Sequence, residues 1–472
     1  MGERSDPSGM LWAPRAWLVD PGTRRGGWHR HVALRIGADG RWAEVAPGIA
    51  EPPRGATVLD GAVLPGLVDA HSHAFQRAFA GLAERRESDA DDFWSWRDRM
   101  YRVALRVTPE QLRAVAAQLY VELLMGGYTQ VCEFHYLQRR EDGTPYDDPL
   151  ALAWAVADAV ADAGIGATIL PVLYERAGFA QPALRDVQRR FRAHAGDVWH
   201  AARRIAAAGR PLVGAGVAVH SLRAAAPESI AELRGLADGW AGPIHIHVAE
   251  QVAEVDECVR ATGARPIEWL ARERLLDARW QLVHATHATR DEIASVAASG
   301  ATVVICPTTE GNLGDGTADL PGWLDAGVPI AIGSDSQVGR DWREELRWLD
   351  YGQRLVLRRR NVAAAPSAGE PSTAARLFEH AVRAGALAAG EPQWGLREGA
   401  RADLLVADPG DPALAGIPAP RVLDAIVFSG PARPWRDVMV AGRWVIRDHV
   451  HPRGEAIMAR FAEAMSALWP DS

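Results

Sequence analysis

The sequence predicts an α/β protein, a TIM-like (β/α)8 barrel with a small β domain built from both ends of the chain. Three observations lead to this prediction. The middle of the chain alternates short apolar, β-branched runs with longer Ala/Leu/Arg-rich stretches of helical character. Polar residues that can carry chemistry follow the carboxyl ends of the apolar runs. The two end segments instead contain strand-sized runs separated by Gly, Pro and Asp.

The end segments are expected to form the small domain. In residues 1–63, RHVALRIGADGRWAEVAPG has alternating segments around a Gly-Ala-Asp-Gly turn, which is typical of a hairpin. Residues 396–472 hold the runs ADLLVADPG, RVLDAIVF and DVMVAGRWVIRD. We expect these two parts to make a small β-sandwich, with a helix at the C-terminus, and residues 64–395 to make the barrel.

Eight runs of the central segment have the length and composition of buried strands. In order they are AVLPGLVDAHSH, YTQVCEFHY, ATILPVLYE, VGAGVAVHS, GPIHIHVAE, WQLVHATH, ATVVICPTT and VPIAIGSDS. Helical stretches such as TPEQLRAVAAQLYVELLMGG lie between most of them. A doubly wound open sheet is the alternative, but no GxGxxG follows the first run, which weakens a dinucleotide-binding interpretation.

Bulk properties exclude several function classes. The 472 residues carry a net charge of −8, which argues against a nucleic-acid binder. The chain contains no lysine, so a P-loop lysine, a Schiff base and a carbamylated-lysine metal bridge are all excluded. Its three cysteines form no CxxC pair, which disfavours a disulfide framework. With no apolar N-terminal segment and no membrane-length apolar run, a cytoplasmic enzyme is expected.

Histidines at two strand ends predict a metal site. His71 and His73 end the first run, and residues i and i+2 of a strand point to the same side. The fifth run ends with His245 and His247, one of which could be a third ligand. Glu250 follows and suits a general acid/base, although an acidic residue is also favoured in the first turn of a helix.

Two later runs add candidates at the same face. His284 ends the sixth run and is a better inward candidate than His287, which could cap the next helix. Asp335 ends the eighth run and could complete the ligand shell or orient a water, although alone it would suit a helix cap. Together these residues predict a three-histidine, one-aspartate site with an open position, as a water-activating divalent ion requires.

His-x-His also occurs away from this face, so the spacing alone is weak evidence. The pairs His29/His31 and His449/His451 lie in the end segments. We expect these four to be surface histidines.

The chain resembles the amidohydrolase superfamily of metallo-dependent hydrolases. The matching segments are LPGLVDAHSH, HVAE, HATH, GSDS and the C-terminal GLREGARADLLVAD, so the resemblance spans nearly the whole chain. Because the binuclear members use a bridging lysine carbamate, the absence of lysine favours the mononuclear deaminase branch.

Within that branch the sequence is similar to the formimidoylglutamate deiminases. The segments that carry this similarity are HSHAFQRAFAGLAE, DDFWSWRDRMY, EFHYL, HSLRA, HIHVAEQ, VHATH, CPTTEGNLGDG and GSDS. The resemblance implies metal-dependent hydrolysis of N-formimidoyl-L-glutamate to N-formyl-L-glutamate and ammonia, in histidine degradation. The alternative is another mononuclear deaminase acting on a purine-like ring amine.

The resemblance also assigns roles to residues. It implies one divalent ion, zinc, held by His71, His73, His247 and Asp335, with Glu250, His284 and Asp335 catalytic. Residues expected to bind a small dicarboxylate substrate are Gln76, Arg97, Tyr136, His220 and Arg223, with Arg99 two residues from Arg97. A homodimer is expected, because that assembly is common in similar proteins. Gln337 stands where a histidine is common, and we expect it not to touch the ligand shell.

Overall fold

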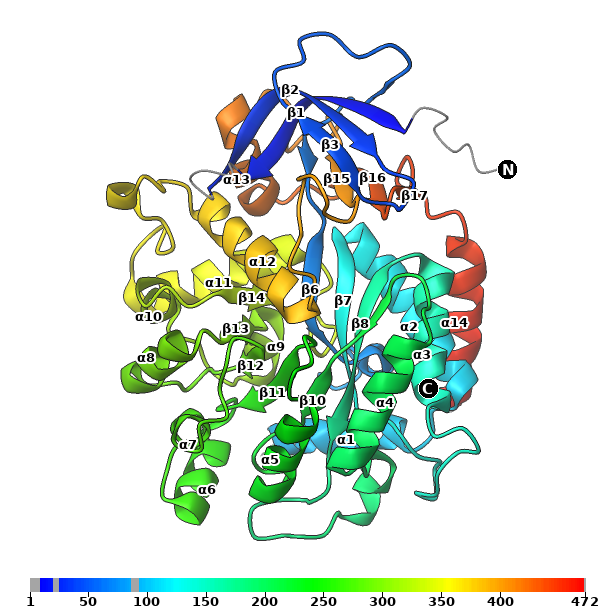
Figure 1. The fold of residues 1–472 in the computed structure, drawn as a ribbon, viewed down its shortest axis with the longest axis vertical. Coiled ribbons are helices and arrows are strands. Elements are labelled where there is room, and N and C mark those ends of the chain that lie inside the picture. The colour runs from blue at the N-terminus through cyan, green and yellow to red at the C-terminus, as the bar shows by residue number, and fades with distance from the viewer. Residues whose placement is uncertain (1–8, 20–24, 86–92, 471–472) are drawn as a thin grey trace.

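The structure, a computed structural model, describes residues 9–19, 25–85 and 93–470. A barrel surrounded by helices forms most of the molecule, and a small β-sheet domain sits at one end of it (Figure 1). Asp91 and Asp92 of the DDFWSWRDRMY segment lie outside the described residues, as do several side chains of the helix that follows them.

Eight parallel strands form the barrel, which confirms the predicted fold class. They are β6 (Leu67–Ser72), β7 (Tyr128–His135), β8 (Gly166–Leu173), β10 (Val217–Val219), β11 (Ile244–Val248), β12 (Trp280–His284), β13 (Thr302–Ile305) and β14 (Ile330–Ile332). The short β9 (Val213–Ala215) pairs with β8. A parallel bridge between Ser72 and Asp335 brings the first and last strands together, so the barrel is nearly closed. Each predicted run overlaps one of these eight strands over nearly the whole length of the strand.

The strands are apolar because both of their faces are covered. Every residue of β7, β8, β11 and β12 is buried. Parallel strands enclosed by helices have no solvent-facing side, so they lose the alternation typical of exposed sheets. The polar exceptions are therefore informative, and His71, His247 and His284 lie within or at the end of such strands.

Helices follow most of the strands and cover the barrel (Figure 1). They are α1 (Phe93–Ala104), α2 (Pro109–Met125), α3 (Ala151–Ala163), α4 (Ala195–Ala207), α5 (Pro227–Leu236), α6 (Val252–Thr262), α7 (Pro266–Arg272), α8 (Arg290–Ser299), α9 (Pro307–Leu313), α10 (Leu320–Asp325), α11 (Trp342–Leu357) and α12 (Thr373–Ala389). Local chemistry sets their ends. Thr108 and Thr289 cap α2 and α8 through their side chains, and Gly164 and Gly300 end α3 and α8 in the left-handed conformation.

The small domain joins both ends of the chain in one mixed sheet. Its strands are β1 (Met10–Val19), β2 (Gly26–Ile36), β3 (Trp42–Ala46), β4 (Thr57–Val58), β5 (Val63–Leu64), β15 (Leu404–Ala407), β16 (Trp435–Val440) and β17 (Arg443–Ile446). The predicted hairpin is β2 and β3. β5 links the two halves, because it pairs with β1 on one side and with β15 on the other.

Two helices belong to the C-terminal segment. α13 (Val422–Phe428) packs on α11 and α12, and α14 (Gly454–Leu468) packs along α2 of the barrel. Just after α14, Trp469 donates its indole N–H to the carbonyl of Ala78, at 2.9 Å. This hydrogen bond joins the residue after α14 to the segment that follows His73. Within the described residues, no helix is both long enough and apolar enough to span a bilayer.

Candidate active site

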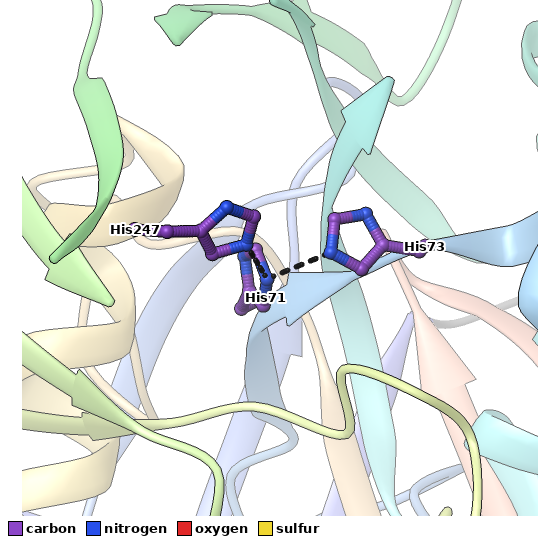
Figure 2. Close-up of side chains that lie close together, drawn as sticks. All are labelled: His71, His73 and His247. Carbon is purple, nitrogen blue, oxygen red and sulfur yellow. Dashed lines mark hydrogen bonds between the residues drawn. The ribbon is translucent and has the colours of Figure 1, made fainter. Parts of the chain in front are cut away.

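The four predicted metal ligands converge at one end of the barrel. His71 lies in β6, His73 follows it directly, His247 lies in β11 and Asp335 follows β14. His71 Nε2 is 3.1 Å from His73 Nε2 and 2.9 Å from His247 Nε2. Asp335 Oδ1 is 3.4 Å from His71 Nε2 and 3.3 Å from His73 Nε2. Figure 2 shows the three imidazoles pointing toward one another.

Backbone carbonyls set the tautomers of two of these histidines. His73 Nδ1 is 3.1 Å from the carbonyl of Phe134, and His247 Nδ1 is 2.9 Å from the carbonyl of His220. A carbonyl can only accept, so both Nδ1 atoms carry a hydrogen and both Nε2 atoms present a lone pair in the neutral ring. Burial lowers the pKa of His71 to about 3 and lowers that of His247, which keeps both rings neutral.

This arrangement fits a cation. Two Nε2 lone pairs face His71 Nε2, which can supply at most one hydrogen between them. A tetrahedral ion with bonds of about 2.0–2.1 Å places its ligand atoms roughly 3.3–3.4 Å apart, close to the separations found here. The cluster therefore has the donor types, the protonation and the spacing of a divalent metal site.

His284 and Glu250 lie beside the cluster. His284 Nε2 is 3.7 Å from Glu250 Oε1 and 3.9 Å from Asp335 Oδ2. Burial raises the pKa of Glu250 to about 7. Burial alone would lower the pKa of His284, but the carboxylates of Glu250, Glu310 and Asp335 raise it to about 10. Two groups that can exchange protons thus adjoin the ligand set.

The backbone at these strand ends is unusual. His284 has φ of 69° and Asp335 has φ of 51°, in the left-handed region that favours glycine. Such residues cost about 1–3 kcal/mol each and persist where the surroundings hold them. Ala249, between His247 and Glu250, has φ of 52°, and Glu254 accepts the backbone N–H groups of Ala249 and Glu250 at 3.3 and 3.0 Å.

Buried polar residues behind the site hold the ligand segments. Glu133 accepts the Ala74 N–H at 2.7 Å and the Ser72 hydroxyl at 3.0 Å, on either side of His73. His284 Nδ1 is 3.4 Å from Glu310 Oε1, which also accepts the Cys306 N–H. These supporting carboxylates are missing from the sequence-based prediction, because their role depends on neighbours distant in the chain.

The expectation for Gln337 was wrong. Its side-chain amide donates to the carbonyl of Asp335 at 2.8 Å and to the hydroxyl of Ser72 at 3.1 Å. Ser72 is the residue between His71 and His73. Gln337 is fully buried, so it contacts the ligand segments from behind rather than lying apart from them.

A cavity opens over the cluster and collects the remaining predicted residues. Its lining comprises His73, Gln76, Trp96, Arg97, Met100, Tyr101, Tyr136, Tyr174, Phe191, His220, Arg223, His247, Glu250, His284, Leu313 and Asp335. All five residues predicted to bind substrate are among them. Gln76 Nε2 donates to the hydroxyl of Tyr136 at 3.0 Å, and Tyr136 lies edge-on to His73 with ring centroids 5.0 Å apart.

The structure separates Arg97 from Arg99. Arg97 lines the cavity, where burial and then repulsion by Arg223 lower its pKa. Arg99 is directed elsewhere, donating to the carbonyls of Ala83 and Arg85 at 2.5 and 2.7 Å. Of the two arginines, Arg97 is therefore the one placed to meet a molecule in the cavity of its own chain.

The other histidines take different positions. His245 Nε2 is 2.9 Å from the carbonyl of Ala388 in α12, and His245 is absent from the ligand cluster. His29, His31 and His449 are partly exposed, in line with the expectation. The expectation was wrong for His451, which is buried, with Nε2 2.9 Å from the carbonyl of Ala163 at the end of α3. It anchors the C-terminal segment to the barrel.

Several further residues near the cavity carry no sequence prediction, and four of them share a hydrogen-bonded or aromatic contact. Tyr101, Tyr174 and Phe191 line it, and Gln188 lies behind them. Tyr101 belongs to the aromatic segment DDFWSWRDRMY, one of the segments that carry the family resemblance. Its place in that segment could have marked Tyr101 as a site residue. Phe191 and Gln188 lie in the 3-10 helix η2 (Asp186–Phe191), which no motif had marked.

A nearly closed parallel barrel with a buried histidine–aspartate cluster at its strand ends defines a metal-dependent hydrolase. The chain belongs to the amidohydrolase family, whose model matches residues 62–445. It is 45% identical over 463 residues to "Formimidoylglutamate deiminase" of Pseudomonas aeruginosa, covering 97% of this chain and 99% of that protein.

Solved structures show the same fold. A crystal structure of an amidohydrolase from Brucella melitensis has a TM-score of 0.90 and 40% identity, over 97% of this chain and 99% of that one. A crystal structure of an adenosine deaminase from Xanthomonas campestris with bound zinc has a TM-score of 0.77 and 23% identity, over 98% of each chain. At 23% identity, the similarity to the adenosine deaminase shows a shared fold only.

Proposed function

We propose that this chain is a formimidoylglutamate deiminase, a hydrolase that converts N-formimidoyl-L-glutamate to N-formyl-L-glutamate and ammonia in histidine degradation. One observation carries the proposal beyond the 45% identity to the Pseudomonas aeruginosa enzyme. A cavity brings the histidine–aspartate cluster and Glu250 together with the guanidinium groups of Arg97 and Arg223. The substrate has a formimidoyl group and two carboxylates, and guanidinium is the side-chain group best suited to carboxylate.

His71, His73, His247 and Asp335 would hold one divalent ion, zinc. When bound, such an ion polarises its ligands and brings the pKa of a water from about 15.7 toward about 7. The donor set of three imidazoles and a carboxylate suits zinc, and an adenosine deaminase of the same fold contains it. Metal analysis of the purified protein tests this assignment.

The residues of the chain then handle binding and protons. Arg223 and Arg97 pair with the carboxylates, while Gln76, Tyr136 and His220 surround the rest of the substrate. Glu250 accepts a proton from the attacking water as its oxygen bonds to the formimidoyl carbon. The formimidoyl group reacts in its protonated amidinium form, so its terminal nitrogen already carries two hydrogens. Glu250 returns the proton to this nitrogen, and the carbon–nitrogen bond breaks to release ammonia. His284, which keeps its proton because its pKa is raised to about 10, orients the attacking oxygen, and the carboxylate of Asp335 receives the second proton of that oxygen as the formyl group forms.

Ammonia release from N-formimidoyl-L-glutamate by protein of known metal content tests this function. Adenosine and guanine are measured in parallel, because a purine-like substrate is the alternative. Rapid turnover of a purine with none of N-formimidoyl-L-glutamate would refute the proposal. Sedimentation measurements on the same preparation test the homodimer that the resemblance leads us to expect.

A further inference from the structure

One part of the cavity wall is formed by two tyrosines that share a buried amide. Tyr101 lies in α1 and Tyr174 follows β8. Gln188 Nε2 is 3.2 Å from Tyr101 Oη and 2.8 Å from Tyr174 Oη. The Gln188 side chain is fully buried, and its oxygen accepts the backbone N–H of Arg185 at 3.0 Å. That bond fixes the amide with its NH2 group toward the two phenols.

The direction of these hydrogen bonds follows from the chemistry. An amide NH2 only donates, so the tyrosine oxygen accepts in both contacts. Tyr101 Oη also accepts from Arg185 Nη2, at 3.3 Å. A phenolic oxygen has two lone pairs and one hydrogen, so Tyr101 can meet a further partner only as a donor. Its hydroxyl neighbours that of Tyr174, but a carboxylate entering the cavity would be the stronger acceptor.

Positive charge gathers around the same phenol. Arg97 Cζ lies 5.7 Å from the centroid of the Tyr101 ring, and Arg185 Cζ lies 5.4 Å from it. Arg223 is near enough to Arg97 to lower its pKa. A neutral O–H donor among guanidinium groups suits a carboxylate, because it adds a directed hydrogen bond to the charge that they supply.

Tyr101 is separated from the metal ligands by two rings. The centroid distances are 5.9 Å from Tyr101 to Phe191, 5.0 Å from Phe191 to Tyr136 and 5.0 Å from Tyr136 to His73. In N-formimidoyl-L-glutamate the α-carboxylate is three bonds from the reacting carbon, and the side-chain carboxylate is five bonds from it. The position of Tyr101 suits the more distant group.

We propose that Tyr101 is a specificity-determining residue whose hydroxyl, held by Gln188, donates to the side-chain carboxylate of an N-formimidoyl amino acid beside Arg97. This inference rests on the proposed deiminase function. Gln188 acts as a positioning residue, because it orients the phenol without lining the cavity. The tyrosine thereby favours a dicarboxylate over an amino acid derivative with an apolar side chain.

The test compares two substrates that differ at that carboxylate. N-Formimidoyl-L-glutamate and N-formimidoyl-L-norvaline, which has a methyl group in its place, are given to metal-quantified wild-type protein and Tyr101→Phe. We expect the substitution to lower kcat/KM for the glutamate derivative by roughly 10–100-fold, mainly through KM. For the norvaline derivative we expect a change of less than about 2-fold, because the lost hydrogen bond has no partner there.

Gln188→Met gives an independent variant in which Tyr101 is retained, and we expect the same selective loss at smaller size. Tyr351→Phe, on the surface of α11, is the matched control and should change neither substrate. An equal loss on both substrates, in Tyr101→Phe or in Gln188→Met, would overturn the inference, and so would an unchanged KM for the glutamate derivative. Wild-type protein that releases no ammonia from N-formimidoyl-L-glutamate would instead refute the proposed function, and this inference with it.

Discussion

The Nε2 atoms of His71 and His247 lie 2.9 Å apart, although 176 residues separate them in the chain. They come from β6 and β11, which are not neighbours in the barrel sheet. His73 Nε2 presents a lone pair to His71 Nε2 as His247 Nε2 does, and His71 can supply a hydrogen to only one of them, whereas a cation would bind all three nitrogens. The contact between His71 and His247 therefore locates the metal site at the carboxyl ends of the barrel strands.

Removing one of these rings should abolish metal binding. We expect His247→Ala to weaken divalent-ion affinity by at least roughly 100-fold, because even the loss of a group outside the ligand set costs about 10–100-fold. Metal content after dialysis and a competition titration with a chromogenic chelator measure this. His29→Ala, in the His-x-His pair of β2, should keep the full metal content. Full occupancy in His247→Ala would rule out His247 as a ligand.

Glu250 should be required for turnover but not for the fold. We expect Glu250→Gln to lower kcat by roughly 10²–10⁴-fold, because the amide cannot accept the proton of the water. Metal content and the melting temperature should stay those of the wild type. Asp256→Asn, on the exposed side of α6, is the control. A Glu250→Gln protein with normal kcat would exclude Glu250 as the base.

Arg223 should act on substrate binding. We expect Arg223→Met to raise KM for N-formimidoyl-L-glutamate by roughly 10–100-fold, because a charge-assisted hydrogen bond to a carboxylate is lost. Metal content should not change, since Arg223 is absent from the ligand cluster. Steady-state kinetics measure the effect, with the exposed Arg290→Met as a control of equal charge. An unchanged KM would remove Arg223 from the carboxylate site.

The pH dependence of activity should follow Glu250. Its pKa is raised to about 7 by burial, and the reaction needs the carboxylate form. Activity should therefore be present above this pKa and fall as the pH decreases through it, by about tenfold per unit. A bound cation favours the carboxylate, so the inflection in kcat/KM lies at or below about pH 7. A flat profile between pH 5 and 7.5 would contradict this role.

Arg190 should matter for stability. This fully buried guanidinium donates to the carbonyls of Ala104, Val107 and Arg139 at 2.6, 2.9 and 2.8 Å. We expect Arg190→Met to lower the free energy of unfolding by about 2–4 kcal/mol, because buried carbonyls lose their donors. Denaturant unfolding measures the change, and the exposed Arg102→Met of α1 should stay within about 0.5 kcal/mol of the wild type. A loss as small as that of the control would show that other donors or water replace Arg190.

The sequence by itself determined the barrel, the assembly of the small domain from both ends of the chain, and the set of residues at the catalytic face. Strand-length apolar runs and helical stretches are local patterns, and a side chain at the end of a parallel strand must lie at one face of a barrel. The predicted positions of His71, His73, Glu250 and Asp335 needed no more than this rule.

Only the tertiary structure decided which neighbours complete the site. It brought Gln188 of η2 to Tyr101 of α1, directed Arg97 rather than Arg99 into the cavity, and buried His451 against α3. These outcomes depend on how segments far apart in the chain pack, and on where each side chain finds a hydrogen-bond partner once water is excluded. A local sequence pattern carries no information about such partners. The position of a side chain at the end of a parallel strand, by contrast, can be predicted from one segment alone.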